Sequence, residues 1–221
     1  MSSQLPTWAM DRKTLQYYSS NFIGVAERYE ATESALAQFF ATAFKKYGRI
    51  LDVGCGSGRD LSELFRQGFD VYGLDGTPEL VELSQRRHPE LKGRVTHGLL
   101  PSFEPPYGGH FDGVLCSAVL MHLELVQLNP AAASIRACLR RGGRLLISVP
   151  SKRPGLDKGD RDSHGRLFVP HSTRLLVNTF RKCDFTLLDE WTNEDSLNRQ
   201  GFEWVSQLYE FTTQFGFNRG A

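Results

Sequence analysis

The stretch RILDVGCGSGRD, Arg49–Asp60, joins a short apolar run to three glycines and then to the start of a helical pattern. Ile50, Leu51 and Val53 suit a central parallel strand, because such strands are buried on both faces. The glycines permit positive φ angles and let the backbone approach a ligand closely. Residues 59–65 then carry apolar side chains at helical spacing. The stretch therefore predicts a strand, a ligand-binding turn and a helix.

The spacing of the three glycines distinguishes two classes of nucleotide-binding turn. A dinucleotide turn has the form G-x-G-x-x-G and places a helix N-terminus against a pyrophosphate. Counted from Gly54, the third glycine here, Gly58, falls one place early. Arg59 then occupies the position where close packing of the helix on the strand needs a small residue. The spacing therefore disfavours a dinucleotide.

The pattern that is present, D-x-G-x-G-x-G, resembles motif I of the class I S-adenosylmethionine-dependent methyltransferases. In that family the glycine loop passes beneath the methionine part of the cofactor and binds no phosphate. The resemblance implies that S-adenosyl-L-methionine is the cofactor. It also implies cofactor contacts at Asp52, Gly54, Cys55, Gly56, Gly58 and Arg59.

An acidic residue ends the next predicted strand, 70–75, at a spacing that supports this reading. Asp75 follows Gly58 by 17 positions, and a carboxylate there can accept hydrogen bonds from both ribose hydroxyls. The alternative is that Asp75 caps the following helix, but Thr77 is better placed for that role. We therefore predict that Asp75, with Gly76 beside it, contacts the cofactor.

The resemblance extends from Leu15 to Pro150, and five βα units predict an α/β doubly wound sheet with helices on both faces. In the family an antiparallel last strand lies between two others, which implies a seven-stranded, mostly parallel sheet. Gly142–Gly143 is the expected C-cap of one helix. Beyond the first strand, the predicted strands are 70–75, 94–99, 111–117, 144–149, 184–191 and 202–211, and the predicted helices are 78–87, 130–141 and 172–181.

Helical patterns before the first strand predict a lid over the ligand edge of the sheet. Leu15–Tyr29 fits one or two helices interrupted at Gly24, and Thr32–Lys46 fits an amphipathic helix that begins at an N-cap threonine. The resemblance implies that the aromatic part closes over the cofactor, with Tyr18 and Tyr29 against it. The alternative is ordinary packing of these aromatic side chains on the sheet.

The loops after the third and fourth strands complete the predicted cofactor site. In the family the first of these loops faces the adenine, and here Leu99 and Leu100 predict apolar and backbone contacts. The end of the fourth strand resembles motif IV, which lies beside the reactive methyl group. Cys116, Ser117 and Ala118 are therefore expected to line the transfer site. Open α/β sheets bind ligands at this carboxyl edge of their strands.

Two histidines near that edge are candidates for proton transfer during methylation. His122 and His164 could each take a proton from the acceptor near neutral pH. A histidine near a helix start, as at His122, is more often a satisfied packing residue.

The charged loop 151–166 is expected to be exposed and to contribute substrate recognition. We place the acceptor pocket at Tyr17, Arg161 and Arg166, which favours a substrate with an acidic or hydrogen-bond-accepting group. The alternative is a solvated linker in which Arg166 pairs with Asp162 at the surface.

The length of 221 residues predicts one domain, with a lid in 11–46, a cofactor-binding core in 49–150 and the substrate loop, last helix and strand pair in 151–221. Its 26 basic and 25 acidic side chains give a formal net charge of +1. This balance makes nucleic acid unlikely as the main ligand.

The four cysteines are scattered without a C-x-x-C pair, so we expect reduced, buried thiols and assign no metal. Residues 1–10 lack the regions of a secretory signal, and no window reaches about 18 consecutive apolar residues. These features predict a cytoplasmic protein without a membrane segment.

The resulting hypothesis is a methyltransferase that transfers a methyl group from S-adenosylmethionine to an oxygen or nitrogen of a small molecule, as a monomer or homodimer. One alternative is methylation of nucleic acid or protein, against which the near-neutral charge and the missing RNA-binding appendage count. The other is a non-catalytic module that binds S-adenosylmethionine, and the sequence leaves that alternative open.

Overall fold

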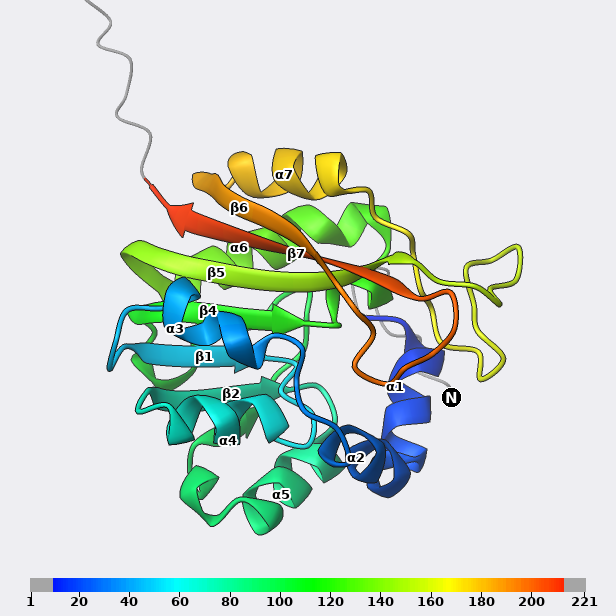
Figure 1. Cartoon of the computed structure of the whole chain (residues 1–221), viewed down its shortest axis with the longest axis horizontal. Helices are drawn as coiled ribbons and strands as arrows, with labels where there is room; N and C mark the ends of the chain where they lie inside the picture. The colour runs from blue at the N-terminus through cyan, green and yellow to red at the C-terminus, as the bar shows by residue number, and fades with distance from the viewer. Residues whose placement is uncertain (1–9, 213–221) are drawn as a thin grey trace, which may run out of the picture.

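The computed structural model describes residues 10–212, in which a seven-stranded sheet is covered by helices (Figure 1). The strand order is β3-β2-β1-β4-β5-β7-β6, and β7 is antiparallel to both of its neighbours. This order confirms the predicted α/β sheet with an antiparallel last strand. The strands are β1 (Arg49–Val53), β2 (Asp70–Asp75), β3 (Val95–His97), β4 (Phe111–Ser117), β5 (Leu139–Lys152), β6 (Phe185–Asn193) and β7 (Glu203–Phe211).

The central strands are buried on both faces, as their apolar runs predict. In β1, Leu51 and Val53 belong to one core cluster, and Ile50 belongs to the other. The first core includes side chains of α6 (Leu128–Cys138) and α7 (Thr173–Arg181). The second includes α3 (Phe40–Ala43) and α4 (Arg59–Arg66), which lie in front of the sheet in Figure 1. Helices therefore cover both faces.

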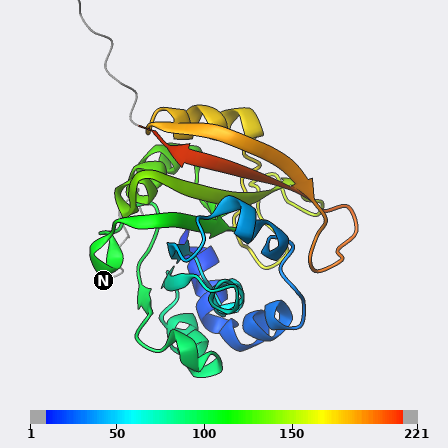
Figure 2. The ribbon, with the colours of Figure 1, turned by 60° about the vertical axis from the view of Figure 1, so that its left-hand side comes forward.

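Two predicted helices of the core are found almost unchanged. α5 (Pro78–Arg87) begins after the N-cap residue Thr77, with proline in the first turn. α7 begins after Ser172, whose hydroxyl accepts a hydrogen bond from the amide of Leu175 at 3.2 Å. α7 runs along the β6–β7 edge in both ribbon views (Figure 2), whereas the connection between β6 and β7 projects beyond the end of the sheet.

The segment before the first strand forms the predicted lid helices but not the second long helix. α1 (Arg12–Ser20) and α2 (Phe22–Glu30) break at Asn21, so the expected interruption at Gly24, which lies inside α2, is wrong. They lie at the carboxyl edge of the parallel strands (Figure 1). The two helices therefore lie at the edge of the sheet that was expected, but the break between them is at Asn21.

The helix expected over Thr32–Lys46 is wrong for most of its length, because only a 3-10 turn, Ala37–Phe39, and α3 are helical. Two polar contacts explain the irregular backbone. The Ser34 hydroxyl accepts a hydrogen bond from the amide of Leu36 at 3.2 Å, and the amide of Ala35 donates to Ser196 at 3.4 Å. Serine side chains that bind nearby backbone groups in this way compete with helix formation.

The helix before β5 ends earlier than its glycine pair suggested. α6 stops at Cys138, and Leu139 is extended and pairs with Phe111 of β4. The expected C-cap at Gly142–Gly143 is therefore wrong, and these glycines lie within the strand. Pairing with a neighbouring strand provides hydrogen bonds for backbone groups that a helix C-cap would otherwise have to bind.

Most residues of the loop 151–166 are exposed, as expected, but two of its charged side chains are buried. Asp162 and Arg166 are only 8% and 7% exposed, and Arg161 forms an isolated bridge with Leu167. Asp162 pairs with Arg166, as the alternative reading of the sequence suggested, but the pair is buried. Ion pairing of this kind lets charged side chains leave the solvent.

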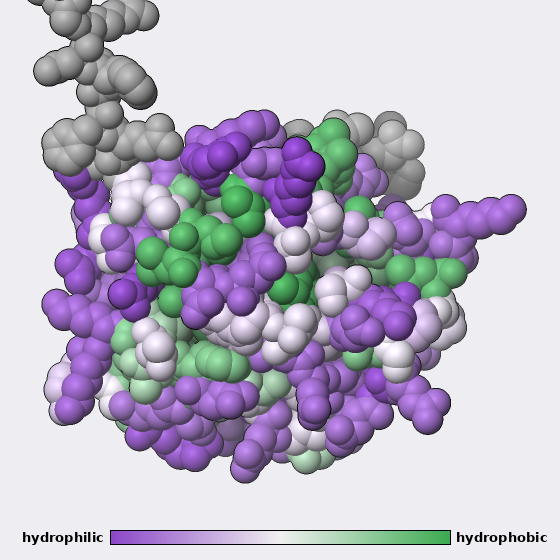
Figure 3. Space-filling model, turned by 45° about the horizontal axis from the view of Figure 1, so that its top comes forward, coloured by the Kyte–Doolittle hydropathy of each residue, from purple (hydrophilic) through white to green (hydrophobic). Residues whose placement is uncertain are grey.

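The surface in Figure 3 is mainly polar, with apolar side chains in scattered patches. Within residues 10–212 no helix combines the length and the apolar character that crossing a membrane requires. The N-terminal stretch examined for a secretory signal lies outside the described residues, except for Met10.

Candidate active site

The glycine loop after β1 exposes its backbone to a cavity at the carboxyl edge of the sheet. Gly54 has a φ of +81°, and a β-carbon added there would overlap the side chain of Val119. Gly56 has a φ of +55°, and a β-carbon there would meet no atom within 4 Å. The loop therefore requires glycine at the first position and faces open space at the second.

Asp75 ties this loop to the start of α5. Its carboxylate accepts hydrogen bonds from the amides of Gly56 and Thr77, each at 2.8 Å. The side chain is buried, and burial raises its pKa despite these two bonds. A carboxylate has about four lone-pair sites, so two backbone donors leave acceptor capacity for a ligand.

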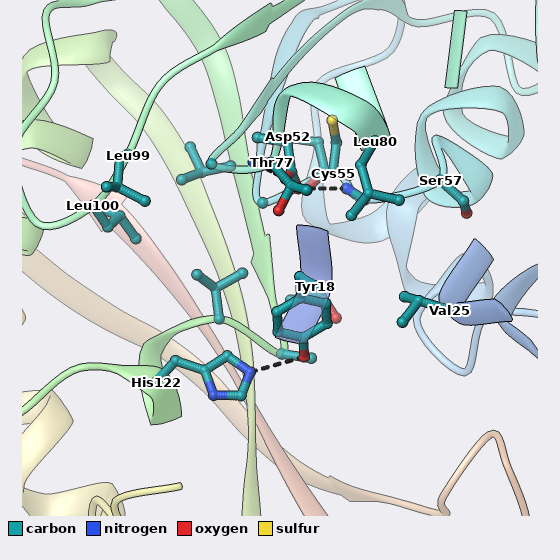
Figure 4. Close-up of a pocket in the computed structure, with 18 of the residues that line it drawn as sticks. Tyr18, Val25, Asp52, Cys55, Ser57, Thr77, Leu80, Leu99, Leu100 and His122 are labelled. Atoms are coloured by element: carbon teal, nitrogen blue, oxygen red, sulfur yellow. Dashed lines mark hydrogen bonds between the residues drawn. The ribbon is translucent and has the colours of Figure 1, made fainter. Parts of the chain in front are cut away.

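A single cavity is lined by all of the predicted cofactor residues except Gly58 and Cys116 (Figure 4). Gly58 is instead the N-cap residue before α4 and has a φ of +88°, and a β-carbon there would press on Leu91. Cys116 is fully buried in the first core. The predicted residues that line the cavity are Tyr18, Tyr29, Asp52, Gly54, Cys55, Gly56, Arg59, Asp75, Gly76, Leu99, Leu100, Ser117 and Ala118.

Sequence reasoning missed further lining residues, most of them apolar. Leu80 lies in the first turn of α5 after Thr77, so its position next to the site was readable from the helix pattern. Val119 follows the predicted transfer site directly. The other side chains carry no local signal. They include Met10 just before the lid segment, Leu15 and Val25 in its helices, Ser57 and Thr77 in loops, and Asp60 in α4.

Tyr18 of α1 and His122 lie together on the opposite wall of the cavity from the glycine loop (Figure 4). The Tyr18 hydroxyl is 3.0 Å from Nε2 of His122, and Nδ1 of His122 is 2.6 Å from the carbonyl oxygen of Leu167. Because a carbonyl can only accept, Nδ1 carries the proton and Nε2 accepts from Tyr18. Burial lowers the pKa of His122 to about 4 and raises that of Tyr18. Both groups are therefore neutral near pH 7.

The cations predicted to recognise the substrate are bound to carboxylates and do not line this cavity. Arg166 donates to Asp162 through Nη2 at 2.7 Å and Nε at 3.0 Å, and through Nη1 to the Tyr18 hydroxyl at 3.3 Å. Arg161 binds Asp11 at 2.8 and 3.1 Å. The structure thus brings Arg166 next to Tyr18, behind the cavity wall.

The remaining two predicted residues also lie outside the cavity lining. His164 is exposed, and its ring centroid is 5.1 Å from that of Tyr17. The guanidinium of Arg166 lies over the Tyr17 ring at 4.4 Å. Among residues 10–212, no three His, Cys, Asp or Glu side chains form a group that could hold a metal.

Comparison with known proteins gives matches over most of the chain. A family model described as "Methyltransferase domain" matches residues 25–207. An uncharacterized methyltransferase of Alkaliphilus oremlandii is 26% identical over 162 residues, which cover 70% of this chain and 72% of that protein. A ubiquinone biosynthesis O-methyltransferase of Xanthomonas axonopodis pv. citri is 33% identical over 111 residues, 48% of this chain and 44% of the relative.

Among solved structures, the 1,6-didemethyltoxoflavin-N1-methyltransferase of Burkholderia thailandensis superimposes with a TM-score of 0.67 at 23% identity. The alignment covers 90% of this chain and 88% of that one. At this identity the likeness shows a common fold. The match over 25–207, together with the motif, the sheet order and the cavity, shows that this chain belongs to the methyltransferase domain family and is a class I S-adenosylmethionine-dependent methyltransferase.

Proposed function

We propose that this methyltransferase acts on an oxygen or nitrogen of a small molecule. The observation that carries the proposal is the Tyr18–His122 pair, a neutral hydrogen-bonding pair that the lid adds to the cavity beside Ala118. Helices of the lid lie over this edge of the sheet, which suits a small acceptor better than a polymer. The solved relative from Burkholderia thailandensis holds a small acceptor and S-adenosylhomocysteine.

The residues of the cavity fit S-adenosylmethionine in three parts. Asp75 retains acceptor capacity for the ribose hydroxyls, and the open side of Gly56 leaves room for the methionine part. Leu99 and Leu100 form an apolar wall suited to the adenine ring. Tyr29 and Arg59 line the same cavity, with the guanidinium 5.7 Å from the ring, and are assigned to the methionine end.

When bound, S-adenosylmethionine supplies a sulfonium methyl group, whose transfer breaks the carbon–sulfur bond and forms a bond to the acceptor, while the proton of the acceptor passes to solvent. The protein mainly has to align the acceptor with that methyl group. Ala118 follows β4 and has a strained φ of +58° beside the cavity. Such strain is concentrated at functional sites.

Tyr18 is assigned the role of aligning the acceptor through its hydroxyl oxygen. His122 takes part by accepting the Tyr18 proton, which fixes the direction of the hydroxyl. A pKa of about 4 makes His122 a weak base near pH 7, so orientation of the acceptor suits it better than full proton removal.

The free cysteines agree with a cytoplasmic location, because reduced thiols persist there. Cys55, Cys116 and Cys138 are buried, and Cys183 is half-buried.

Two measurements test the proposed function. Calorimetric titration should show that S-adenosylhomocysteine binds the purified protein. Incubation of the protein with metabolite extracts and labelled S-adenosylmethionine should transfer label to a small molecule. Binding without any transfer would favour a non-catalytic module, and transfer only to macromolecules would reject the small-molecule acceptor.

A further inference from the structure

A second cavity adjoins the first on the α3 side of the sheet. The two cavities share the lining residues Tyr29, Arg59, Ser117 and Ala118. Its outer walls are residues 34–36 and the turn 193–199 between β6 and β7, which projects past the sheet in Figure 2. The Ala35 amide, which donates to the Ser196 hydroxyl at 3.4 Å, joins these walls. The second cavity therefore meets the first cavity at the end of β4.

Two serines of adjacent strands line this second cavity at the same level. Ser117 of β4 pairs in register with Ser148 of β5, so both side chains lie on one face of the sheet. Ser148 is only 4% exposed. Within residues 10–212 neither hydroxyl has a hydrogen-bond partner. Ser117 is half-buried, and neither hydroxyl oxygen is fully buried, so both are open to a ligand that enters the second cavity.

The next serine in the same row shows how such a hydroxyl is satisfied where no cavity exists. Ser206 of β7 pairs with Ser148, is fully buried and lies outside the cavity lining. Its hydroxyl donates to Asn193 at 2.5 Å. Among the three serines of the row, the two without a partner are the two that line the cavity.

The charged groups of the second cavity are largely neutralised by one another. Asp195 accepts from Arg199 at 2.6 and 2.9 Å and from the Trp204 indole at 2.9 Å. Arg59 binds Asp60 at 2.8 Å. The exposed carboxylate of Glu194 also lines the cavity and would repel an anion.

We propose that the second cavity binds the body of the methyl acceptor, and that this body is a neutral group that hydrogen-bonds to Ser117 and Ser148. The nucleophilic atom then reaches past Ala118 into the first cavity, within reach of Tyr18. This inference rests on the proposed function. It replaces the acidic substrate that Arg161 and Arg166 suggested, because both guanidinium groups are bound to carboxylates.

Phenol and benzoate test the inference, because they share a ring and differ in charge. Each is titrated into protein saturated with S-adenosylhomocysteine, and nuclear magnetic resonance follows the Trp204 indole and the Ser148 amide. Phenol should shift both signals and benzoate should not. In Ser148→Ala the dissociation constant of phenol should rise about two- to tenfold, as expected for one neutral hydrogen bond, with unchanged S-adenosylhomocysteine affinity.

Two further variants separate this site from general effects on the fold. Ser134→Ala is the matched control, because Ser134 lies on α6, outside both cavities, where its hydroxyl donates to the carbonyl of Pro101. Phenol binding should be unchanged in that variant. Ser196→Trp places a bulky ring at the cavity wall from a surface turn and should abolish the phenol-induced shifts.

Several results would overturn the inference while leaving the proposed function intact. They are normal S-adenosylhomocysteine binding together with no phenol shift at Ser148 and Trp204, equal binding of benzoate, or an unchanged phenol affinity in Ser148→Ala. Failure of the wild-type protein to bind S-adenosylhomocysteine would instead reject the cofactor placement on which the inference depends.

Discussion

The Tyr18 hydroxyl lies 3.0 Å from Nε2 of His122 and thereby links the lid helix α1 to the turn after β4. The second nitrogen of His122 is held by the Leu167 carbonyl at 2.6 Å. Three segments far apart in the sequence therefore fix one hydroxyl group at the cavity wall. Such a network is rigid because each hydrogen bond fixes the orientation of the next group.

Tyr18→Phe should lower kcat about tenfold while the dissociation constant of S-adenosylhomocysteine changes less than threefold. The change removes the hydroxyl that we assign to the acceptor and leaves Nε2 of His122 without its donor. Steady-state kinetics with the identified acceptor and calorimetry supply the two numbers. Tyr47→Phe, at a side chain that is 71% exposed, is the control and should have no effect. An unchanged kcat in Tyr18→Phe would remove the hydroxyl from the reaction.

His122 should make the stability of the protein depend on pH between about 4 and 6.5. Burial lowers its pKa in the folded state to about 4, from the ordinary 6.5. Between these values the unfolded chain binds more protons, so the stabilising contribution is complete above 6.5 and is lost as the pH falls toward 4. The full difference corresponds to about 3 kcal/mol.

Urea unfolding of the wild-type protein and His122→Gln at several pH values checks this dependence. The wild type should lose about 3 kcal/mol more than the variant between pH 6.5 and 4. The pKa of His171 is also lowered by burial, but His171 is common to both proteins and cancels in the difference. Parallel curves for the two proteins would contradict a buried neutral His122.

The sequence predicts the sheet well because buried strands are specified locally. β2 and β4 coincide with their predicted ranges, since apolar runs bounded by loop residues leave few alternatives. The helix prediction for the segment 32–46 is wrong because its apolar side chains have helical spacing but pack against residues far away in the sequence. Phe39 packs on Trp191 of β6 with ring centroids 4.6 Å apart. Tertiary contacts of this kind override local helix preference.

The cofactor side of the site is predictable for the same reason. The glycine loop and Asp75 lie within two adjoining βα units, so their spacing in the sequence carries the geometry. The pairing of Arg161 with Asp11 joins residues 150 positions apart, and spacing gave no sign of it. The second cavity likewise depends on Ser148 and the turn 193–199, which meet only through the strand order.

Asp75→Asn should weaken S-adenosylhomocysteine binding by about tenfold to a hundredfold, because charged hydrogen bonds to a carboxylate are worth about 1.5–3 kcal/mol. The side-chain amide of asparagine would also place an N–H donor where the carboxylate of Asp75 now accepts hydrogen bonds from two backbone N–H groups. Calorimetry measures the change. Asp70→Asn, at the other end of β2 in a partly exposed pair with Arg94, is the control and should stay within twofold.

A comparison of two ligands separates ribose binding by Asp75 from its support of the loop. The wild-type protein should bind 5′-methylthioadenosine more tightly than the 2′-deoxy analogue, and Asp75→Asn should lose that preference. If the variant weakens both ligands equally, Asp75 acts only by holding Gly56 and Thr77.

Arg161→Ala should loosen the lid, because Arg161 holds the start of α1. Its guanidinium binds Asp11, whose carboxylate also caps the helix through the amide of Thr14 at 2.8 Å. Burial raises the pKa of Asp11, but the bonds from Arg161 and Thr14 outweigh it and bring the pKa to about 2. The carboxylate is therefore charged at neutral pH, and the pair persists there.

Hydrogen exchange over residues 15–30 measures this loosening directly. In the wild-type protein, S-adenosylhomocysteine should slow exchange in this segment, as expected when a lid orders on its ligand. In Arg161→Ala, exchange without ligand should be faster, and the ligand should bind more weakly because part of its binding energy goes into ordering α1. Arg94→Ala breaks an ion pair remote from α1 and should leave exchange in 15–30 unchanged. Equal exchange in Arg161→Ala and the wild type would show that the contact with Asp11 does not hold the lid, and an absence of slowing in the wild type would reject the lid itself.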